Sequence, residues 1–181
     1  MINSKTSFLA LIGNPVEHSL SPIMHNAALK YLNIDLVYLA LPCKNDDFEI
    51  VVNTLKKINC KGLNITIPFK ERAFKLCKEI SPIAEKVKAV NTLILNREGE
   101  WIGTNTDCEG LIYPLKKLKI RNKEALILGS GGAARSAIQG LINMNFSNIN
   151  IISRNKASLN KIICDFQDNI YLKSFLNNDI Q

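Results

Sequence analysis

Residues 124–134 read Glu-Ala-Leu-Ile-Leu-Gly-Ser-Gly-Gly-Ala-Ala, and this stretch decides how the second half of the chain folds. The apolar residues after the glutamate predict a strand, and residues 132–144 predict a helix. Between them, Gly129, Gly131 and Ala134 fit the pattern Gly-x-Gly-x-x-Gly/Ala, in which glycine permits a tight turn and a close approach to a pyrophosphate. The stretch therefore predicts a dinucleotide-binding unit. The alternative is a glycine-rich turn in another kind of α/β protein.

The residues that follow the next strand indicate which dinucleotide is bound. A strand is predicted at Asn148–Ser153 and a helix at 156–166. Folds that prefer NAD place an acidic residue at the end of this strand, but here the chain reads Ser-Arg-Asn-Lys. Arginine can bind a 2′-phosphate that a carboxylate would repel, so we predict NADP; the alternative is a solvated Arg154. The predicted cofactor-binding residues are Gly129, Ser130, Gly131, Gly132, Ala133, Ser153, Arg154, Asn155 and Lys156.

Strand and helix signals alternate along the rest of the chain. Strands are predicted at Ser7–Gly13, Leu36–Leu41, Gly62–Ile67, Val90–Asn96 and Trp101–Thr104, the last two as a hairpin, with a further strand at Ile170–Lys173. Helices are predicted from Ser21 (as N-cap before Pro22), over 48–58 (capped by Asn45 or Asp46), from Pro68 to about Lys88, and over Asp107–Leu118. This alternation predicts an α/β fold.

The predicted architecture is an N-terminal α/β substrate domain joined to an incomplete Rossmann domain, that is, a doubly wound parallel NADP-binding domain. We expect the substrate domain to span residues 1–108, a linker helix 109–122, and the first half of the dinucleotide-binding domain 123–181. A doubly wound sheet has six strands ordered 3-2-1-4-5-6, and this sequence supplies signals for the first three. We therefore expect a C-terminally truncated domain whose exposed strand edge promotes self-association.

Polar residues gather after the predicted strands of the first domain. Ser19 and Ser21 follow the first strand, Asn64 and Thr66 alternate along the third, and Lys70 comes four residues later. Asn91 lies at the start of the hairpin, and Asp107 follows it. Hydroxyl and amide side chains at strand ends, with one lysine and one aspartate, resemble a pocket for a polyhydroxylated molecule.

Five motifs together resemble the successive motifs of the shikimate dehydrogenase family. They are Gly-Asn-Pro-Val-Glu-His-Ser-Leu-Ser-Pro at 13–22, Gly-Leu-Asn-Ile-Thr-Ile-Pro-Phe-Lys at 62–70, Ala-Val-Asn-Thr at 89–92, Gly-Thr-Asn-Thr-Asp at 103–107 and the glycine stretch at 129–134. They occur in the order of the family and extend over essentially the whole chain. The resemblance implies interconversion of 3-dehydroshikimate and shikimate with NADP, on the route to chorismate and the aromatic amino acids.

The resemblance also implies roles for single residues. Ser19 and Ser21 would hold the substrate carboxylate, and Asn64, Thr66, Asn91 and Asp107 would bind ring hydroxyls. Lys70 and Asp107 would form the catalytic pair, with Lys70 as the acid and base that also contacts the substrate. Reduction of a ketone requires a proton for the forming alkoxide, which a partly desolvated lysine can supply. The alternative is that Lys70 belongs only to a charged helix start.

Three positions depart from the family pattern, and the length leaves two interpretations of the isolated chain. Lys88 stands where many family members have glycine, and Ser153 and Asn155 replace the usual neighbours of the arginine. The chain is either a truncated, catalytically weak or inactive dehydrogenase or a module that only binds shikimate. A quinate/shikimate dehydrogenase of broader specificity is a further alternative.

The composition excludes several other classes of protein. The 181 residues are 46% hydrophobic, and no apolar run approaches the roughly 20 residues that span a membrane. Neither a signal nor a transit peptide is expected. Five scattered cysteines and two histidines predict no disulfide framework and no metal site, and indicate a cytoplasmic location. The net charge of +7 is scattered without interleaved aromatic residues, so we expect no nucleic-acid partner; a homodimer is expected.

Overall fold

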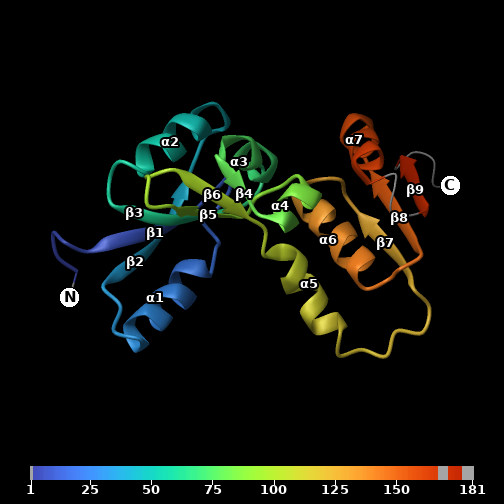
Figure 1. Cartoon of the computed structure of the whole chain (residues 1–181), viewed down its shortest axis with the longest axis horizontal. Helices are drawn as coiled ribbons and strands as arrows, with labels where there is room; N and C mark the ends of the chain where they lie inside the picture. Colours follow the sequence, from blue (N-terminus) through green and yellow to red (C-terminus); the bar gives the residue numbers. More distant parts are fainter. Residues whose placement is uncertain (1, 167–170, 177–181) are drawn as a thin grey trace. The chain divides into compact units, whose positions relative to one another are not determined.

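The computed structural model describes residues 2–166 and 171–176, coloured along the chain in Figure 1. Contacts divide the chain into two compact units, one of residues 1–85 and 89–104 and the other of residues 86–88 and 105–181. Ile170, where a strand was predicted to begin, and residues 177–181 lie outside the described residues.

A mixed sheet forms the centre of the first unit. Its described strands are β1 (Ser7–Gly13), β2 (Leu36–Pro42), β3 (Cys60–Ile65), β4 (Glu79–Ile80), β5 (Thr92–Leu95) and β6 (Trp101–Thr104). They are arranged in the order β2-β1-β3-β5-β6-β4. Strand β1 pairs in parallel with β2 and β3, whereas β5 runs antiparallel to both β3 and β6. The parallel part follows from helical crossovers and the antiparallel part from a hairpin turn.

Helices cover both faces of this sheet (Figure 1). They are α1 (Ser21–Tyr31), α2 (Phe48–Leu55), which follows the 3₁₀ turn η1 (Asn45–Asp47), α3 (Lys70–Leu76) and α4 (Pro82–Val87). On the face of α2 and α3, an apolar core includes the buried side chains of Phe48, Val52 and Trp101. A smaller cluster on the face of α1 includes Leu11, Val16 and Tyr38. Alternation of side chains along the strands supplies both clusters.

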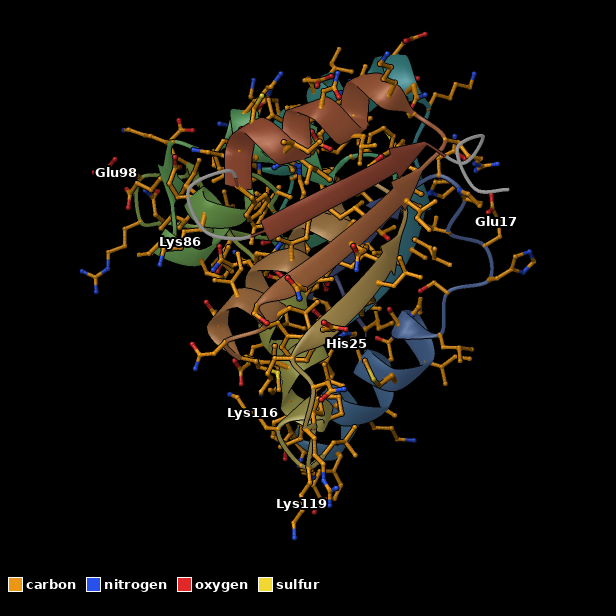
Figure 2. All side chains as sticks on the ribbon, turned by 90° about the vertical axis from the view of Figure 1, so that its right-hand side faces the viewer. Glu17, His25, Lys86, Glu98, Lys116 and Lys119 are labelled. Carbon is orange, nitrogen blue, oxygen red and sulfur yellow. The ribbon has the colours of Figure 1, made fainter. Side chains whose placement is uncertain are left out.

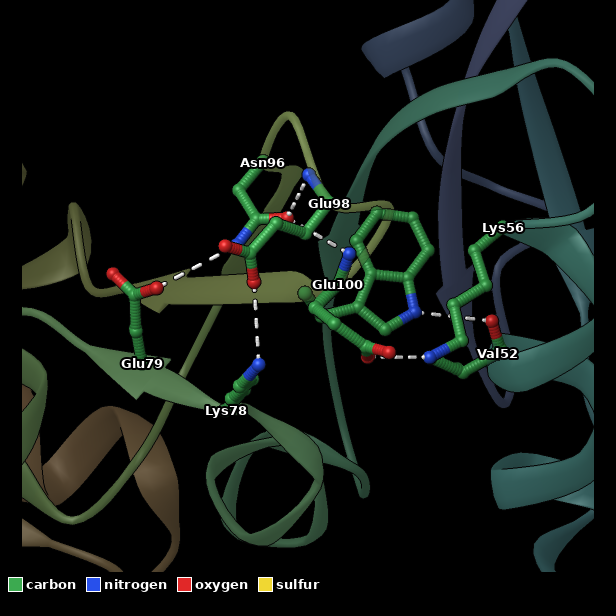
Figure 3. Close-up of polar contacts among 8 residues, drawn as sticks. Val52, Lys56, Lys78, Glu79, Asn96, Glu98 and Glu100 are labelled. Atoms are coloured by element: carbon green, nitrogen blue, oxygen red, sulfur yellow. Dashed lines mark hydrogen bonds and ion pairs between the residues drawn. The ribbon is translucent and has the colours of Figure 1, made fainter.

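Trp101 connects the hairpin to α2 by a hydrogen bond to Val52, which Figure 3 labels. Its side chain is 1% exposed, and its Nε1–H donates to the carbonyl of Val52 at 3.1 Å. In the preceding turn, the side-chain oxygen of Asn96 accepts the backbone N–H groups of Glu98 and Glu100, each at 2.9 Å. These bonds fix the turn, and with it the register of β6 against β5.

The strand predictions are confirmed to within three residues, but several helix predictions are wrong. Leu20, and not Ser21, is the N-cap of α1, and the N–H of Ser21 donates to Ser19 Oγ at 3.2 Å. Neither Asn45 nor Asp46 caps α2, because η1 precedes that helix without a side-chain cap.

The predicted helix from Pro68 to Lys88 is interrupted by β4. The N–H of Lys78 donates to the carbonyl of Trp101 at 3.1 Å, and that of Ser81 donates to Gly103 at 2.9 Å. Pairing with β6 therefore overrides the local helical preference, which is a tertiary effect that periodicity cannot register.

The second unit carries a parallel sheet in the order β7-β8-β9. Its described elements are α5 (Asp107–Leu115), β7 (Glu124–Leu128), α6 (Gly132–Asn143), β8 (Asn148–Ser153), α7 (Lys156–Phe166) and β9 (Tyr171–Leu176). This is the arrangement of the first three strands of a doubly wound domain. Buried side chains of Ile138, Ile149 and Ile162 form its core.

Helix α5 packs closely on α6 because Gly140 has no side chain. A Cβ atom at this position would lie 2.8 Å from Ile112 Cγ2 of α5. Beyond this contact, Lys116 and Lys119 extend away from the ribbon (Figure 2). No helix among the described residues is long and apolar enough to cross a membrane.

Strand β2 is an edge strand whose outer side is occupied by a side chain of α1. The N–H of Tyr38 donates to Asn26 Oδ1 at 2.8 Å, and Asn26 Nδ2 donates to the carbonyl of Tyr38 at 2.9 Å. The carboxamide of Asn26 thus bonds to both the N–H and the carbonyl of Tyr38, which could otherwise pair with an additional strand.

Replacing Asn26 with alanine should destabilise the first unit. The change leaves two backbone groups of Tyr38 without their partner, at a cost of about 1–3 kcal/mol in the free energy of unfolding. The fluorescence of Trp101, the single tryptophan, reports this unit in a urea titration. Asn53→Ala, at an exposed position of α2, is the matched control. Equal midpoints for the two variants would contradict the role assigned to Asn26.

Candidate functional site

A pocket of about 320 Å³ opens in the first unit beyond the carboxyl end of β1. Its lining includes Val16, His18, Ser19, Ser21 and Thr66. The N–H of Thr66 donates to the carbonyl of Ile12 at 2.9 Å, so the residue after β3 is held beside the last residues of β1. Three of the predicted substrate-binding residues, the two serines and the threonine, therefore line one cavity.

A chain of hydrogen bonds next to this pocket joins other predicted residues. Tyr38 packs with Leu11 and Val16, which line the pocket, and its hydroxyl donates to Asn64 Oδ1 at 2.7 Å. Asn64 Nδ2 donates to Thr92 Oγ1 at 3.3 Å, and Thr92 Oγ1 donates to Asn91 Oδ1 at 3.0 Å. Tyr38, Asn64 and Asn91 thus belong to a single network.

Tyr38 and Thr92 were not among the site residues predicted from the sequence. Tyr38 is the one residue with a polar side-chain group in the apolar stretch of β2, which is the signal that could have identified it. Burial raises the pKa of Tyr38 to about 12, so its hydroxyl remains a neutral donor near pH 7. The ring of His25 stacks on it with centroids 4.3 Å apart.

Lys70 is the first residue of α3 and is partly buried. Its carbonyl accepts the N–H of Val90 at 2.9 Å. Asn91, which follows Val90, donates its N–H to the carbonyl of Thr104 at 3.1 Å. The carbonyl of Asn91 accepts the N–H of Ile65 at 2.8 Å. Backbone bonds therefore hold Lys70 and the buried Asn91 against adjacent parts of the sheet.

Arg72 anchors the helix that carries Lys70. Its Nε donates to Glu49 Oε1 at 2.7 Å, and a terminal nitrogen donates to the carbonyl of Asn45 at 2.6 Å. The guanidinium lies 5.1 Å and 5.4 Å from the ring centroids of Phe48 and Phe69, which stack on each other. The hydrogen bond from Arg72 is the main cause that lowers the pKa of Glu49. This bidentate contact restrains the start of α3.

The predicted catalytic pair is divided between the two units. Lys70 belongs to the first unit, and Asp107 begins α5 in the second, three residues after β6 ends at Thr104. The N–H of Asp107 donates to Asn105 Oδ1 at 3.0 Å, so a tight local turn fixes its backbone.

Lys88 has a backbone φ of +56°. Residues with a side chain rarely adopt this left-handed conformation, whereas glycine adopts it at little cost. The geometry gives the physical reason why glycine suits this position in the family pattern.

The glycine stretch of the second unit has the geometry of a phosphate-binding turn. Gly129 has a φ of +116°, and Gly131 is the N-cap of the twelve-residue helix α6. Exposed backbone N–H groups at a helix start attract phosphate through hydrogen bonds and the helix dipole. The residues at this turn therefore fit the pyrophosphate of a dinucleotide.

Two of the predicted cofactor-binding residues are bonded to each other. The hydroxyls of Ser130 and Ser153 are buried and lie 2.6 Å apart, which joins the glycine turn to the end of β8. Asn155 Oδ1 accepts the N–H of Ser158 at 3.0 Å and so caps α7. The side chains of Arg154 and Lys156 are exposed beside this cap. They are the groups here that can bind a 2′-phosphate.

No cluster of three or more histidine, cysteine or acidic side chains that could hold a metal occurs within residues 2–166 and 171–176.

Comparison with known proteins supports the resemblance found in the motifs. Residues 11–93 match the family model of the shikimate dehydrogenase substrate binding domain. A shikimate dehydrogenase (NADP(+)) of Prochlorococcus marinus (strain MIT 9312) is 66% identical over 179 residues, which are 99% of this chain and 63% of that protein. The chain thus spans about 63% of the length of this curated relative.

Solved structures of shikimate dehydrogenases share the fold. One in complex with NADP+ is 35% identical, with a TM-score of 0.81 over 96% of this chain and 63% of its own. The enzyme from Listeria monocytogenes, in complex with shikimate and NAD, is 33% identical, with a TM-score of 0.81 over 97% of this chain and 62% of its own. The predicted fold class, a substrate domain with part of a Rossmann domain, is confirmed.

Gly129→Ala should destabilise the second unit more than Gly131→Ala, which only exchanges glycine for the poorer N-cap alanine at the start of α6. A Cβ atom at either position meets nothing within 4 Å, so the two variants differ in the backbone, where only Gly129 has a positive φ. Holding alanine in that conformation costs about 1–3 kcal/mol. Amide hydrogen exchange of Ile149 and Ile151 in β8 measures the stability of this unit. Equal exchange rates in both variants would refute the assigned strain.

Proposed function

The resemblance to shikimate dehydrogenases extends over nearly the whole chain, and from it we propose that this chain carries the substrate pocket, the acid–base lysine and the first part of the cofactor domain of an NADP-dependent shikimate dehydrogenase. The reaction is the reversible reduction of 3-dehydroshikimate to shikimate on the route to chorismate. The observation that carries this proposal is the pocket of about 320 Å³, in which hydroxyl side chains converge at the carboxyl end of β1.

The polar groups of the first unit suit a small, polyhydroxylated acid. Ser19 and Ser21 line the pocket as hydroxyl donors, and we assign them to the substrate carboxylate. Thr66 lines the same pocket, and Asn64 and Asn91 belong to the network behind it. Together with Asp107, these three residues would bind ring hydroxyls. Buried, hydrogen-bonded donors select hydroxylated ligands strongly, because a ligand without the hydroxyl leaves them unpaired.

Lys70 is the residue to which we assign proton transfer. When bound, NADPH supplies a hydride to the carbonyl carbon of 3-dehydroshikimate. The ammonium of Lys70 gives a proton to the carbonyl oxygen as the C=O double bond becomes a single bond. In the reverse direction, the neutral amine of Lys70 takes that proton back. Asp107 would orient the lysine and accept a substrate hydroxyl. Anchoring of α3 by Arg72 and Glu49 restricts where Lys70 can reach.

The second unit would hold the cofactor. The start of α6 would bind the pyrophosphate, and the exposed Arg154 and Lys156 would bind the 2′-phosphate. Buried Ser130 and Ser153 would act by fixing the turn. Residues 1–108 would form the substrate domain, residues 109–122 the connection and residues 123–181 the cofactor domain.

Location and assembly complete the proposal. Free cysteines suit the reducing cytoplasm, and the chain has them at Cys43, Cys60, Cys77, Cys108 and Cys164. Burial raises the pKa of the Cys77 thiol to about 11. A homodimer is the proposed assembly. Among the described strands β7 lies at a sheet edge, with Leu126 and Leu128 exposed. Measurement of the molar mass of the protein in solution tests whether it forms this homodimer.

We expect shikimate-dependent reduction of NADP, and Lys70→Ala should remove most of it. Absorbance of the reduced nicotinamide measures turnover, first with shikimate and then with quinate. The assay uses this chain and a fusion that adds the part of the Prochlorococcus relative that it does not span. The variant should lower kcat by at least about 100-fold, since proton transfer is lost, while NADP binding is retained.

Lys75→Ala, at an exposed position of the same helix, is the matched control and should leave turnover unchanged. An inactive fusion would overturn the enzyme assignment. An active Lys70→Ala fusion would overturn only the role of the lysine.

Arg154→Ala should weaken NADP binding about 10-fold or more, without a comparable loss for NAD. Only NADP carries the 2′-phosphate that this guanidinium would bind. Titration calorimetry with both nucleotides measures the difference, and Arg121→Ala, also exposed in the second unit, controls for net charge. Equal losses for NADP and NAD would show that Arg154 does not read the phosphate.

A further inference from the structure

We propose that Tyr38 is a positioning residue of the substrate site, whose hydroxyl fixes the carboxamide of Asn64 so that its nitrogen is the group offered to a ligand hydroxyl. This inference rests on the proposed function, since it concerns the same pocket. It adds a residue that the motifs do not contain, and it assigns a direction to one hydrogen bond of the substrate.

The direction follows from counting donors. A tyrosine hydroxyl has one hydrogen, and here it is donated to Asn64 Oδ1 at 2.7 Å. Tyr38 is therefore the donor in this bond, and the amide oxygen of Asn64 is the acceptor.

With its oxygen engaged, Asn64 can offer only its Nδ2 hydrogens to a ligand. These hydrogens point to Thr92 Oγ1 at 3.3 Å and to the carbonyl of Asn91 at 3.5 Å. Both distances exceed the usual length of about 2.9–3.0 Å for such a bond, so the nitrogen can turn to a better acceptor at little cost. A substrate hydroxyl beside β3 would be that acceptor.

Three further contacts hold the Tyr38 side chain in place. Its backbone is bonded on both sides by Asn26, at 2.8 and 2.9 Å. Its ring stacks on His25 with an interplanar angle of 14°. The residue is only 2% exposed, and its raised pKa keeps the hydroxyl protonated. A donor held from several directions fixes the orientation of the amide before the ligand arrives.

Shikimate binding to Tyr38→Phe tests the proposal. The change removes one oxygen and keeps the ring that stacks on His25. Titration calorimetry of the 181-residue chain with shikimate should show a dissociation constant raised about 10-fold. Tyr31→Phe, at a position 86% exposed, is the matched control and should bind as the unchanged chain does. Unfolding followed by Trp101 fluorescence shows whether the first unit of each variant is intact.

A double-mutant cycle separates positioning from direct contact. If Tyr38 acts through Asn64, then Tyr38→Phe should cost less than about twofold in a chain that already carries Asn64→Ala. The same loss in both backgrounds would overturn the proposal, because Tyr38 would then act independently of Asn64. No loss from Tyr38→Phe in the otherwise unchanged chain would overturn it as well.

Asn64→Asp provides a test that does not depend on the folding of Tyr38→Phe. A carboxylate still accepts from Tyr38 but has no hydrogen to donate, so binding should fall at least as far as in Asn64→Ala. Binding equal to that of the unchanged chain would overturn the assigned direction. If the unchanged chain and the fusion both fail to bind shikimate, the proposed function fails and this inference fails with it. Binding by the unchanged chain together with an additive cycle would overturn the inference alone.

Discussion

Parallel pairing of β1 with both β2 and β3 is the constraint on which the first unit depends. The register aligns Gly13 with Pro42 and Ile12 with Ile65, so the three strands end at the same edge of the sheet. The segments that follow β1 and β3 must therefore begin side by side. This brings the serines after β1 next to Thr66, although about 45 residues separate them along the chain. A pocket at the carboxyl ends of the strands is the direct consequence of this topology.

Burial of polar groups then determines how those side chains are arranged. A buried hydroxyl or amide without a partner costs roughly 1–3 kcal/mol, so groups brought to one edge must bond to one another or to a ligand. In the first unit, Tyr38 donates a hydrogen bond to Asn64, and Asn64 donates one to Thr92. In the second unit, the hydroxyls of Ser130 and Ser153 bond to each other and hold the phosphate-binding turn in shape. In both units these polar side chains thus bond to one another.

Most elements could be predicted because their signals are local. The strands β1 and β8 and the helix α7 have the predicted bounds, since apolar periodicity and flanking polar residues mark them without reference to the rest of the chain. The short strand β4 could not be predicted, because pairing with β6 alone makes it a strand. Cap assignments failed at Ser21 and Asn45 for a related reason: α1 already includes Ser21 as its first residue, and a 3₁₀ turn replaces a cap before α2.

The candidate site shows the same division between local and distant information. Motifs indicate Ser19, Ser21 and Thr66, but they carry no sign of Tyr38, whose importance arises from contacts with α1 and β3. Its polar group in an apolar strand marks it in the sequence, but its partners, 12 and 26 positions away, are known only once the strands are in register. Its effect is nevertheless specific. Ordering Asn64 before binding spares the ligand the entropic cost of fixing that side chain, which is about 0.5–1.5 kcal/mol for an immobilised side chain. Preorganisation of this kind favours a ligand whose hydroxyls match donors already in place over one that must reorganise them.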